Sequence, residues 1–111
     1  MHPTLPYSPE AMTRDAVDAL PGATLLQFGT DWCGHCQRAE PAVEAALARH
    51  TGLLRRIKVE DGSGRPLGRS FKVKLWPTLI FLRDGQEVER LVRPTEVEPV
   101  AQALAKIDIQ A

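Results

Sequence analysis

Cys33 and Cys36 are the residues of this 111-residue sequence whose types and spacing best suit chemistry, because they are its two cysteines and stand two residues apart. A disulfide that serves stability usually closes a long loop, since the gain grows with loop length. A bridge across two residues gains little, so reactivity explains the pair better. One thiolate would attack a disulfide, and the second thiol would release the mixed disulfide that forms.

The flanking sequence predicts that the cysteine pair lies at the junction between a strand and the helix that follows it. The apolar run 24–28 predicts a buried strand, and residues 33–50 predict a long helix with an apolar stripe. A helix N-terminus offers free N–H groups and a positive dipole end, which lower the pKa of a thiol. We therefore expect Cys33 to be the exposed, reactive nucleophile. Cys36, one turn along and within disulfide reach, is expected to be the buried resolving thiol.

Half of a zinc site is the alternative explanation of the cysteine pair. A closed zinc site needs four ligands, and the other soft candidates are His2, His35 and His50, with no second cysteine pair. Redox use is the better interpretation, with no metal and no cofactor, since the dithiol itself carries two electrons. A small metal carrier remains a rival hypothesis, which the metal content after purification would test.

The other elements follow from the same patterns. Ser8 and Pro9 predict the cap and first position of a helix that ends near Pro21, and Asp84-Gly85 predicts a hairpin. Further strands are expected at 53–59, 78–82 and 86–92, a short helix at 67–73, and a helix at 96–107 capped by Thr95. The order predicts one parallel and one antiparallel pairing, hence an α/β fold with a mixed sheet and helices on both faces. We predict a single domain over residues 1–111.

Composition narrows the class of protein. Hydrophobic residues make up 43% and charged residues 25%, as in an ordinary globular domain, and fourteen basic residues balance fourteen acidic ones. Nothing here favours nucleic acid or an anionic membrane surface, and no apolar run has the length of a membrane span. The start lacks the pattern of a secretory signal, so we expect a cytoplasmic monomer. A periplasmic location is the alternative if a signal peptide has been removed.

Several motifs together resemble the thioredoxin superfamily over nearly the whole chain. Trp32-Cys33-Gly34-His35-Cys36 is similar to the active-site motif of that family, with Gly-His between the cysteines as in protein disulfide isomerase domains. Pro41 matches the proline that kinks the active-site helix, and Asp84-Gly85 matches the hairpin of the family. The segment Trp76-Pro77-Thr78 matches the one whose proline is cis and faces the cysteines. The resemblance implies a thioredoxin fold, three-layer α/β/α around a central mixed sheet.

The resemblance also implies roles for residues near the cysteines. Pro77 and the backbone of Trp76 would form a platform that pairs with an extended substrate peptide. We favour an exposed Trp76 ring beside Cys33 over a core aromatic, and Trp32 is expected beside the cysteines. Gly34, His35 and Trp32 would tune the redox potential, with the His35 imidazole donating a hydrogen bond or positive charge to the Cys33 thiolate.

Two residues depart from the family pattern. Gln27 stands where thioredoxins carry a buried acid that assists proton transfer, and Lys58 or Glu60 are conceivable substitutes. Gln27 would be a hydrogen-bonded buried group or would hold a water. Arg93 replaces a glycine that lets substrates approach, and would stabilise the thiolate, bind an acidic partner or be a solvated charge. We interpret Tyr7, Met12 and Arg55-Arg56 as structural or surface residues.

The sequence thus predicts a thiol:disulfide oxidoreductase that acts on protein disulfides or dithiols, with a reductase or oxidant of unknown identity as its partner. The alternative is a partner-binding or chaperone-like module of the same fold with weak redox turnover. The direction of electron flow is open. Gly-His between the cysteines favours an oxidant or isomerase, whereas the missing signal favours a reducing compartment.

Overall fold

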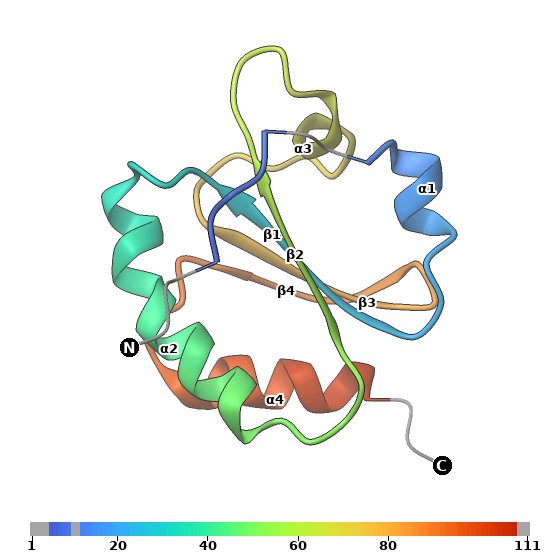
Figure 1. Cartoon of the computed structure of the whole chain (residues 1–111), viewed down its shortest axis with the longest axis vertical. Helices are drawn as coiled ribbons and strands as arrows, with labels where there is room; N and C mark the ends of the chain where they lie inside the picture. Colours follow the sequence, from blue (N-terminus) through green and yellow to red (C-terminus); the bar gives the residue numbers. More distant parts are fainter. Residues whose placement is uncertain (1–4, 10–11, 109–111) are drawn as a thin grey trace.

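In the described part of the chain, four strands form one mixed sheet with helices on both of its faces (Figure 1). The structure is a computed structural model and describes residues 5–9 and 12–108. The elements in chain order are α1 (Arg14–Asp18), β1 (Ala23–Gly29), α2 (Gly34–Arg49), β2 (Arg55–Glu60), α3 (Pro66–Ser70), β3 (Thr78–Arg83), β4 (Gln86–Val92) and α4 (Val97–Ile107).

The sheet has the strand order β2-β1-β3-β4, which confirms the predicted mixture of pairings. β1 runs parallel to β2 and antiparallel to β3, and β3 and β4 form the predicted hairpin. Asp84 and Gly85 turn this hairpin with φ of 51° and 78°, the left-handed region that a tight two-residue turn requires. A side chain at Gly85 would also collide with the carbonyl of Asp18. The strand β1 lies between β2 and β3 and ends at Gly29, four residues before Cys33.

Successive residues of the central strands point to opposite faces and join two separate cores. Leu25 packs with α2 and α4, whereas Leu26 and Phe28 pack with α1 and α3. Every residue of β1 is buried, as a strand covered on both faces requires. The layers are therefore helices, sheet and helices, and the predicted three-layer arrangement is confirmed.

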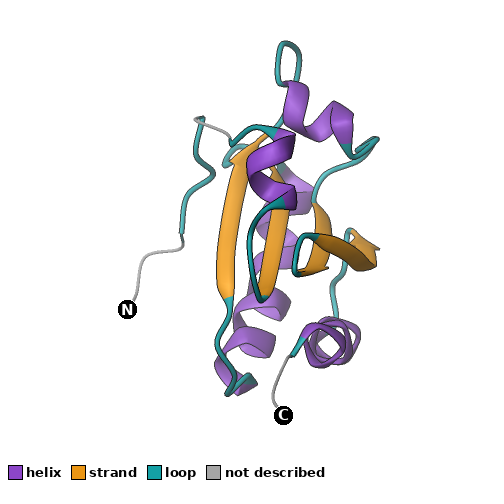
Figure 2. Cartoon of the chain, turned by 90° about the vertical axis from the view of Figure 1, so that its right-hand side faces the viewer, coloured by secondary structure: helices purple, strands orange, loops and turns teal. Residues whose placement is uncertain are grey.

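Residues 5–9, which precede α1, run along the edge of the sheet and form no helix (Figure 2). The N–H of Ser8 donates to the carbonyl of Lys58 at 2.9 Å, and the N–H of Glu60 donates to the carbonyl of Ser8 at 2.8 Å. These bonds hold the chain extended, so the predicted cap at Ser8 was wrong. The cap is Thr13, whose hydroxyl accepts the N–H of Ala16 at 3.1 Å. Part of the predicted helix, residues 10–11, lies outside the described residues.

Other boundaries differ by a few residues from the predictions. β2 begins at Arg55, which pairs with Thr24 of β1, and not at residue 53 as predicted. α3 is shorter than predicted and ends at Ser70. The N-cap of α4 is Glu96 and not Thr95, and the Glu96 side chain makes no capping bond. These shifts leave the strand–helix junction at the cysteines as predicted.

Candidate active site

Cys33 is the N-cap of α2, with an extended backbone at φ −78° and ψ 123°. Its Sγ accepts the backbone N–H of Cys36 at 3.3 Å. Both cysteines are free thiols, and Cys33 is 9% exposed against 3% for Cys36. Cys33 is buried and not exposed as predicted, whereas Cys36 is buried as predicted, so the order of exposure is the predicted one. The helix continues through Pro41, which is exposed, as the kinked-helix interpretation expected.

The surroundings of Cys33 lower its pKa. Burial acts to raise it, but the thiol and backbone N–H of Cys36 and the backbone N–H of His35 hydrogen-bond to its sulfur. The charge of Arg93 adds to them, and the net shift of the Cys33 pKa is downward. Hydrogen bonds to the charged form favour that form, so the site favours a thiolate at Cys33.

The pKa of Cys36 moves the other way. Burial, with a contribution from the hydrogen bond to Cys33, raises it to about 11. Hydrogen bonds from the backbone of Thr30 and the hydroxyl of Tyr7 offset part of this rise. The pair is therefore asymmetric at neutral pH, with one sulfur poised as an anion and its neighbour held as a thiol.

Two tryptophans flank the sulfurs. Trp32 is 73% exposed, and its ring meets that of Trp76 edge-on at 5.9 Å between centroids. Trp76 is partly buried against Tyr7 and the two cysteines, and its indole N–H donates to Asp61 at 2.8 Å. The Trp76 ring therefore lies beside Cys33 as predicted, but it is half-buried and not exposed, and this hydrogen bond helps to hold it there.

Pro77 follows Trp76 through a cis peptide bond, as the resemblance implied. The backbone carbonyl of Trp76, which was expected to be free for a substrate, accepts the Nε–H of Arg93 at 2.9 Å. Arg93 is exposed and has φ 54°, a left-handed conformation that suits the glycine of the family pattern. Its charge thus lies at the platform and acts on Cys33.

The His35 side chain is exposed and turns to Arg38. Its Nδ1 lies 3.1 Å from Nη2 of Arg38, and it must accept because a guanidinium only donates. Slight desolvation and the charges of Arg93 and Arg38 lower the pKa of His35. The group of His35 that acts on the Cys33 sulfur in this structure is its backbone N–H. Gly34 before it leaves room for the Arg38 guanidinium, 3.3 Å from where a Cβ would stand.

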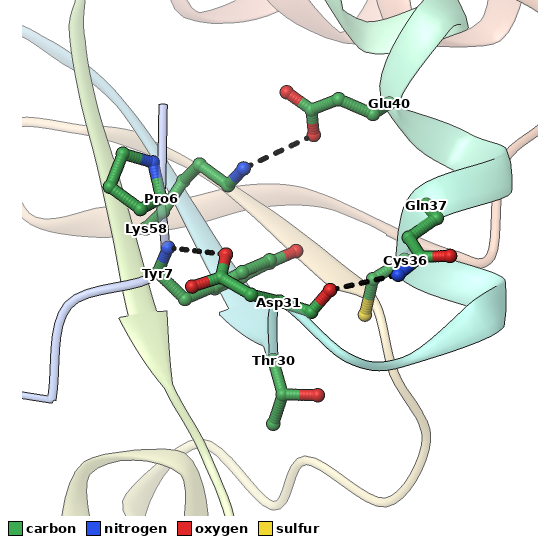
Figure 3. A pocket seen from close by; sticks show the side chains of 8 residues that line it. All are labelled: Pro6, Tyr7, Thr30, Asp31, Cys36, Gln37, Glu40 and Lys58. Atoms are coloured by element: carbon green, nitrogen blue, oxygen red, sulfur yellow. Dashed lines mark hydrogen bonds and ion pairs between the residues drawn. The ribbon is translucent and has the colours of Figure 1, made fainter. Parts of the chain in front are cut away.

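A polar cluster lies behind Cys36, around an open pocket of about 380 Å³ (Figure 3). Gln27, on β1, is fully buried, and its Nε2 donates to the hydroxyl of Tyr7 at 2.8 Å. Nη2 of Arg56 donates to Oε1 of Gln27 at 3.0 Å. Gln27 is thus a hydrogen-bonded buried group, one of the two alternatives that the sequence left open.

Glu40 supplies the negative charge of the cluster. Its carboxylate, from α2, is 2.8 Å from Arg56 and 3.3 Å from the buried Lys58. Burial acts to raise the pKa of Glu40, but these two cations outweigh it and lower the pKa. Glu60, the other conceivable substitute for a buried acid, pairs with Arg65 instead. The buried carboxylate of this site therefore comes from the helix and not from the strand.

Sequence reasoning missed three members of this cluster. Tyr7 and Arg56 were interpreted as structural or surface residues, and Glu40 was not singled out. The four-residue spacing from Cys36 to Glu40, which places both on one helix face, could have revealed the acid. No pattern could have revealed Tyr7, because only the pairing of its segment with β2 brings it to the cysteines.

Within residues 5–9 and 12–108, no group of three or more histidine, cysteine or acidic side chains is placed to hold a metal ion. The same residues include no helix whose length and apolar character would let it cross a membrane.

Comparisons with known proteins agree with this geometry. The family model described as Thioredoxin matches residues 10–106. The thioredoxin of Chlamydia trachomatis is 36% identical over 88 residues, which are 77% of this chain and 82% of that protein. Protein disulfide-isomerase A3 of Gallus gallus is 34% identical over 86 residues, but the chain spans only 17% of its length. The structure of reduced thioredoxin 2 from Pseudomonas aeruginosa PAO1 has 51% identity and a TM-score of 0.82, covering 93% of this chain and 94% of that one.

Proposed function

Since this chain belongs to the thioredoxin family of thiol–disulfide oxidoreductases, we propose that it exchanges disulfides with protein substrates through Cys33 and Cys36. In the forward half-reaction the Cys33 thiolate attacks a substrate disulfide and one substrate thiolate leaves. Cys36 then attacks Cys33, which forms the Cys33–Cys36 disulfide and releases the second substrate thiolate. Trp76 and Pro77 form the surface on which the substrate lies.

The asymmetry of the two thiols is the observation that carries this proposal. Hydrogen bonds and a nearby cation lower the pKa of Cys33, while burial raises that of Cys36 to about 11. The nucleophile must be a thiolate at neutral pH, and the resolving thiol must not compete with it in the resting state. A pair of structural cysteines has no need of this difference.

Reduction of insulin by a small dithiol tests the proposal. Wild-type protein should accelerate the precipitation of insulin chains, and Cys33→Ser should abolish the acceleration. Cys36→Ser should instead accumulate a mixed disulfide with insulin, visible on a non-reducing gel and cleared by reductant. Catalysis that survives in Cys33→Ser would contradict the proposal.

A partner-binding module with weak turnover is the second candidate, and the platform itself favours it. The carbonyl of Trp76 already accepts from Arg93, so a substrate strand that pairs there must share this oxygen with the guanidinium or displace it. Insulin turnover comparable to that of other thioredoxins would exclude this candidate. Stable capture of partners by wild-type protein, with turnover no faster than in Cys33→Ser, would support it.

The direction of electron flow and the location belong to the same proposal. We expect a cytoplasmic protein, which cell fractionation tests. Equilibration of the Cys33–Cys36 couple with glutathione gives the reduction potential, and this value separates a reductant from an oxidant or isomerase.

A further inference from the structure

Arg56, Gln27 and Tyr7 form a chain of hydrogen bonds whose direction is fixed by chemistry. A guanidinium has donors only, so the Gln27 atom that faces Arg56 at 3.0 Å is the amide oxygen. The amide nitrogen of Gln27 must then face Tyr7, to whose oxygen it donates at 2.8 Å. In each hydrogen bond of the chain, the donor is therefore the residue farther from the cysteines.

The last donor of this chain is the Tyr7 hydroxyl, which lies on the side of Cys36. Tyr7, Cys33 and Cys36 pack in one buried cluster, and Tyr7 and Cys36 each shift the pKa of the other. A Cβ placed on Gly29 would lie 2.8 Å from the Tyr7 oxygen and 2.5 Å from the Cys36 sulfur, so the bare Gly29 leaves room for both groups. Because the Tyr7 oxygen already accepts from Gln27, its own hydrogen is available to the sulfur.

We propose, building on the disulfide exchange proposed above, that Tyr7 is a catalytic residue that donates a hydrogen bond to the Cys36 thiolate during resolution of the mixed disulfide. Gln27 and Arg56 are positioning residues that hold the hydroxyl in its donating orientation. A buried thiolate with no donor would be costly to form, and a hydrogen bond to the anion reduces that cost.

The step balances without any further reactant. Cys36 loses its proton to water in the open pocket, and its thiolate attacks the Cys33 sulfur of the mixed disulfide. The Cys33–Cys36 bond forms, the bond from Cys33 to the substrate sulfur breaks, and the substrate leaves as a thiolate. Tyr7 keeps its proton throughout, as its pKa, raised by burial and by the neighbouring Cys36, also favours.

Other charged groups around Cys36 do not take over this role. Glu40 is neutralised by Arg56 and Lys58, and its lowered pKa makes it a weak proton acceptor. Asp31 lines the same pocket, but its carboxylate accepts the backbone N–H of Tyr7 at 3.0 Å. The Tyr7 hydroxyl, by contrast, is a neighbouring side-chain group that lowers the pKa of Cys36.

Stopped-flow reaction of the reduced protein with the aromatic disulfide dithiobis-nitrobenzoate separates the two steps. The first thionitrobenzoate released reports attack by Cys33, and the second reports attack by Cys36. Tyr7→Phe should leave the first phase unchanged and slow the second by about tenfold at neutral pH, the worth of one hydrogen bond to a charged group. The rate of the second phase should still rise with pH, but this rise should occur at a higher pH than in the wild type.

Gln27 variants test the direction of the chain and guard against a folding defect in Tyr7→Phe. Gln27→Met removes the donor to Tyr7 and should slow the second phase. Gln27→Glu should slow it too, because a carboxylate would draw the Tyr7 hydrogen away from Cys36. A second phase that is unchanged in Tyr7→Phe, equal slowing of both phases, or a faster second phase in Gln27→Glu would overturn the inference. Insulin turnover by wild-type protein is judged separately, so a failure of the proposed function is distinguishable.

Discussion

The Sγ of Cys33 accepts the backbone N–H of Cys36 at 3.3 Å, so the first cysteine caps the helix that carries the second. A side-chain cap at a helix N-terminus contributes about 1 kcal/mol to stability. The same bond favours the thiolate of Cys33, since an anion is the better acceptor. The helix and the Cys33 thiolate therefore stabilise each other, while Cys36 stays an uncharged thiol at neutral pH.

Alkylation should follow this asymmetry. Iodoacetamide is expected to label Cys33 much faster than Cys36 in the reduced protein near neutral pH, because the pKa of Cys33 is lowered and that of Cys36 raised to about 11. Peptide mapping after short exposures measures both rates in one sample. Equal rates would contradict the assignment of nucleophile and resolving thiol.

Glu40 should make an unusually large contribution to stability for an acidic residue of a helix. Glu40→Gln leaves the buried Lys58 without its carboxylate partner and Arg56 with only the exposed Glu44, which should cost about 3–5 kcal/mol. Glu44→Gln is the matched control: Glu44 also pairs with Arg56, at 3.3 Å, but is exposed and should contribute about 0.2–1 kcal/mol. Urea unfolding of the three proteins measures both losses.

The contribution of Glu40 should also depend on pH. Its pKa in the folded protein is lowered, so its stabilisation is present above the unfolded-state pKa, about 4.3. It is lost as the pH falls through the folded-state pKa. The free energy of unfolding of the wild type should fall more steeply there than that of Glu40→Gln. Parallel curves for the two proteins would show that Glu40 is not the titrating group.

The fold was largely predictable because its signals are local. Neighbouring residues in the sequence were enough to predict the apolar strands β1 and β3 and the Asp84-Gly85 turn. The pairing of the strands in the sheet then followed from the order of the elements. The start of the chain was not predictable in this way. Ser8 and Pro9 carry a local helix signal, and pairing with β2 overrides it.

The residues of the candidate site also differ in whether local sequence motifs could predict them. The cysteines and Pro77 were located by short motifs, and the structure puts the cysteines at the start of α2 and gives Pro77 a cis peptide bond, as those motifs implied. The cluster behind Cys36 was not, because Tyr7, Gln27 and Arg56 come from three separate segments that only the folded sheet brings together. A buried hydrogen-bond network of this kind leaves no spacing rule in the sequence.

Arg93→Ala tests whether the charge at the platform acts on the nucleophile. The charge of Arg93 lowers the pKa of Cys33, so its loss should slow alkylation of Cys33 at neutral pH. The side chain is exposed, so the effect should be less than about fivefold and should shrink at high salt. Arg38→Ala is the control, because Arg38 pairs with His35 and is not among the main causes of the shift in the Cys33 pKa. Equal slowing in both variants would remove the role assigned to Arg93.

His35→Pro and His35→Ala together decide which part of His35 tunes the redox potential. The backbone N–H of His35 hydrogen-bonds to the Cys33 sulfur, whereas the imidazole is turned to Arg38. Proline removes that N–H and is tolerated in the first helical turn, where backbone N–H groups have no partner within the helix. Alanine removes the imidazole and keeps the N–H.

Loss of the hydrogen bond destabilises the Cys33 thiolate, and hence the reduced form of the protein, more than it destabilises the disulfide form. The reduction potential of His35→Pro should therefore become more negative. One hydrogen bond to a charged group is worth about 1.5–3 kcal/mol, which corresponds to about 30–60 mV for this two-electron couple. His35→Ala should shift much less. Glutathione equilibration measures both variants, and an equal shift in the two would move the tuning from the backbone to the imidazole.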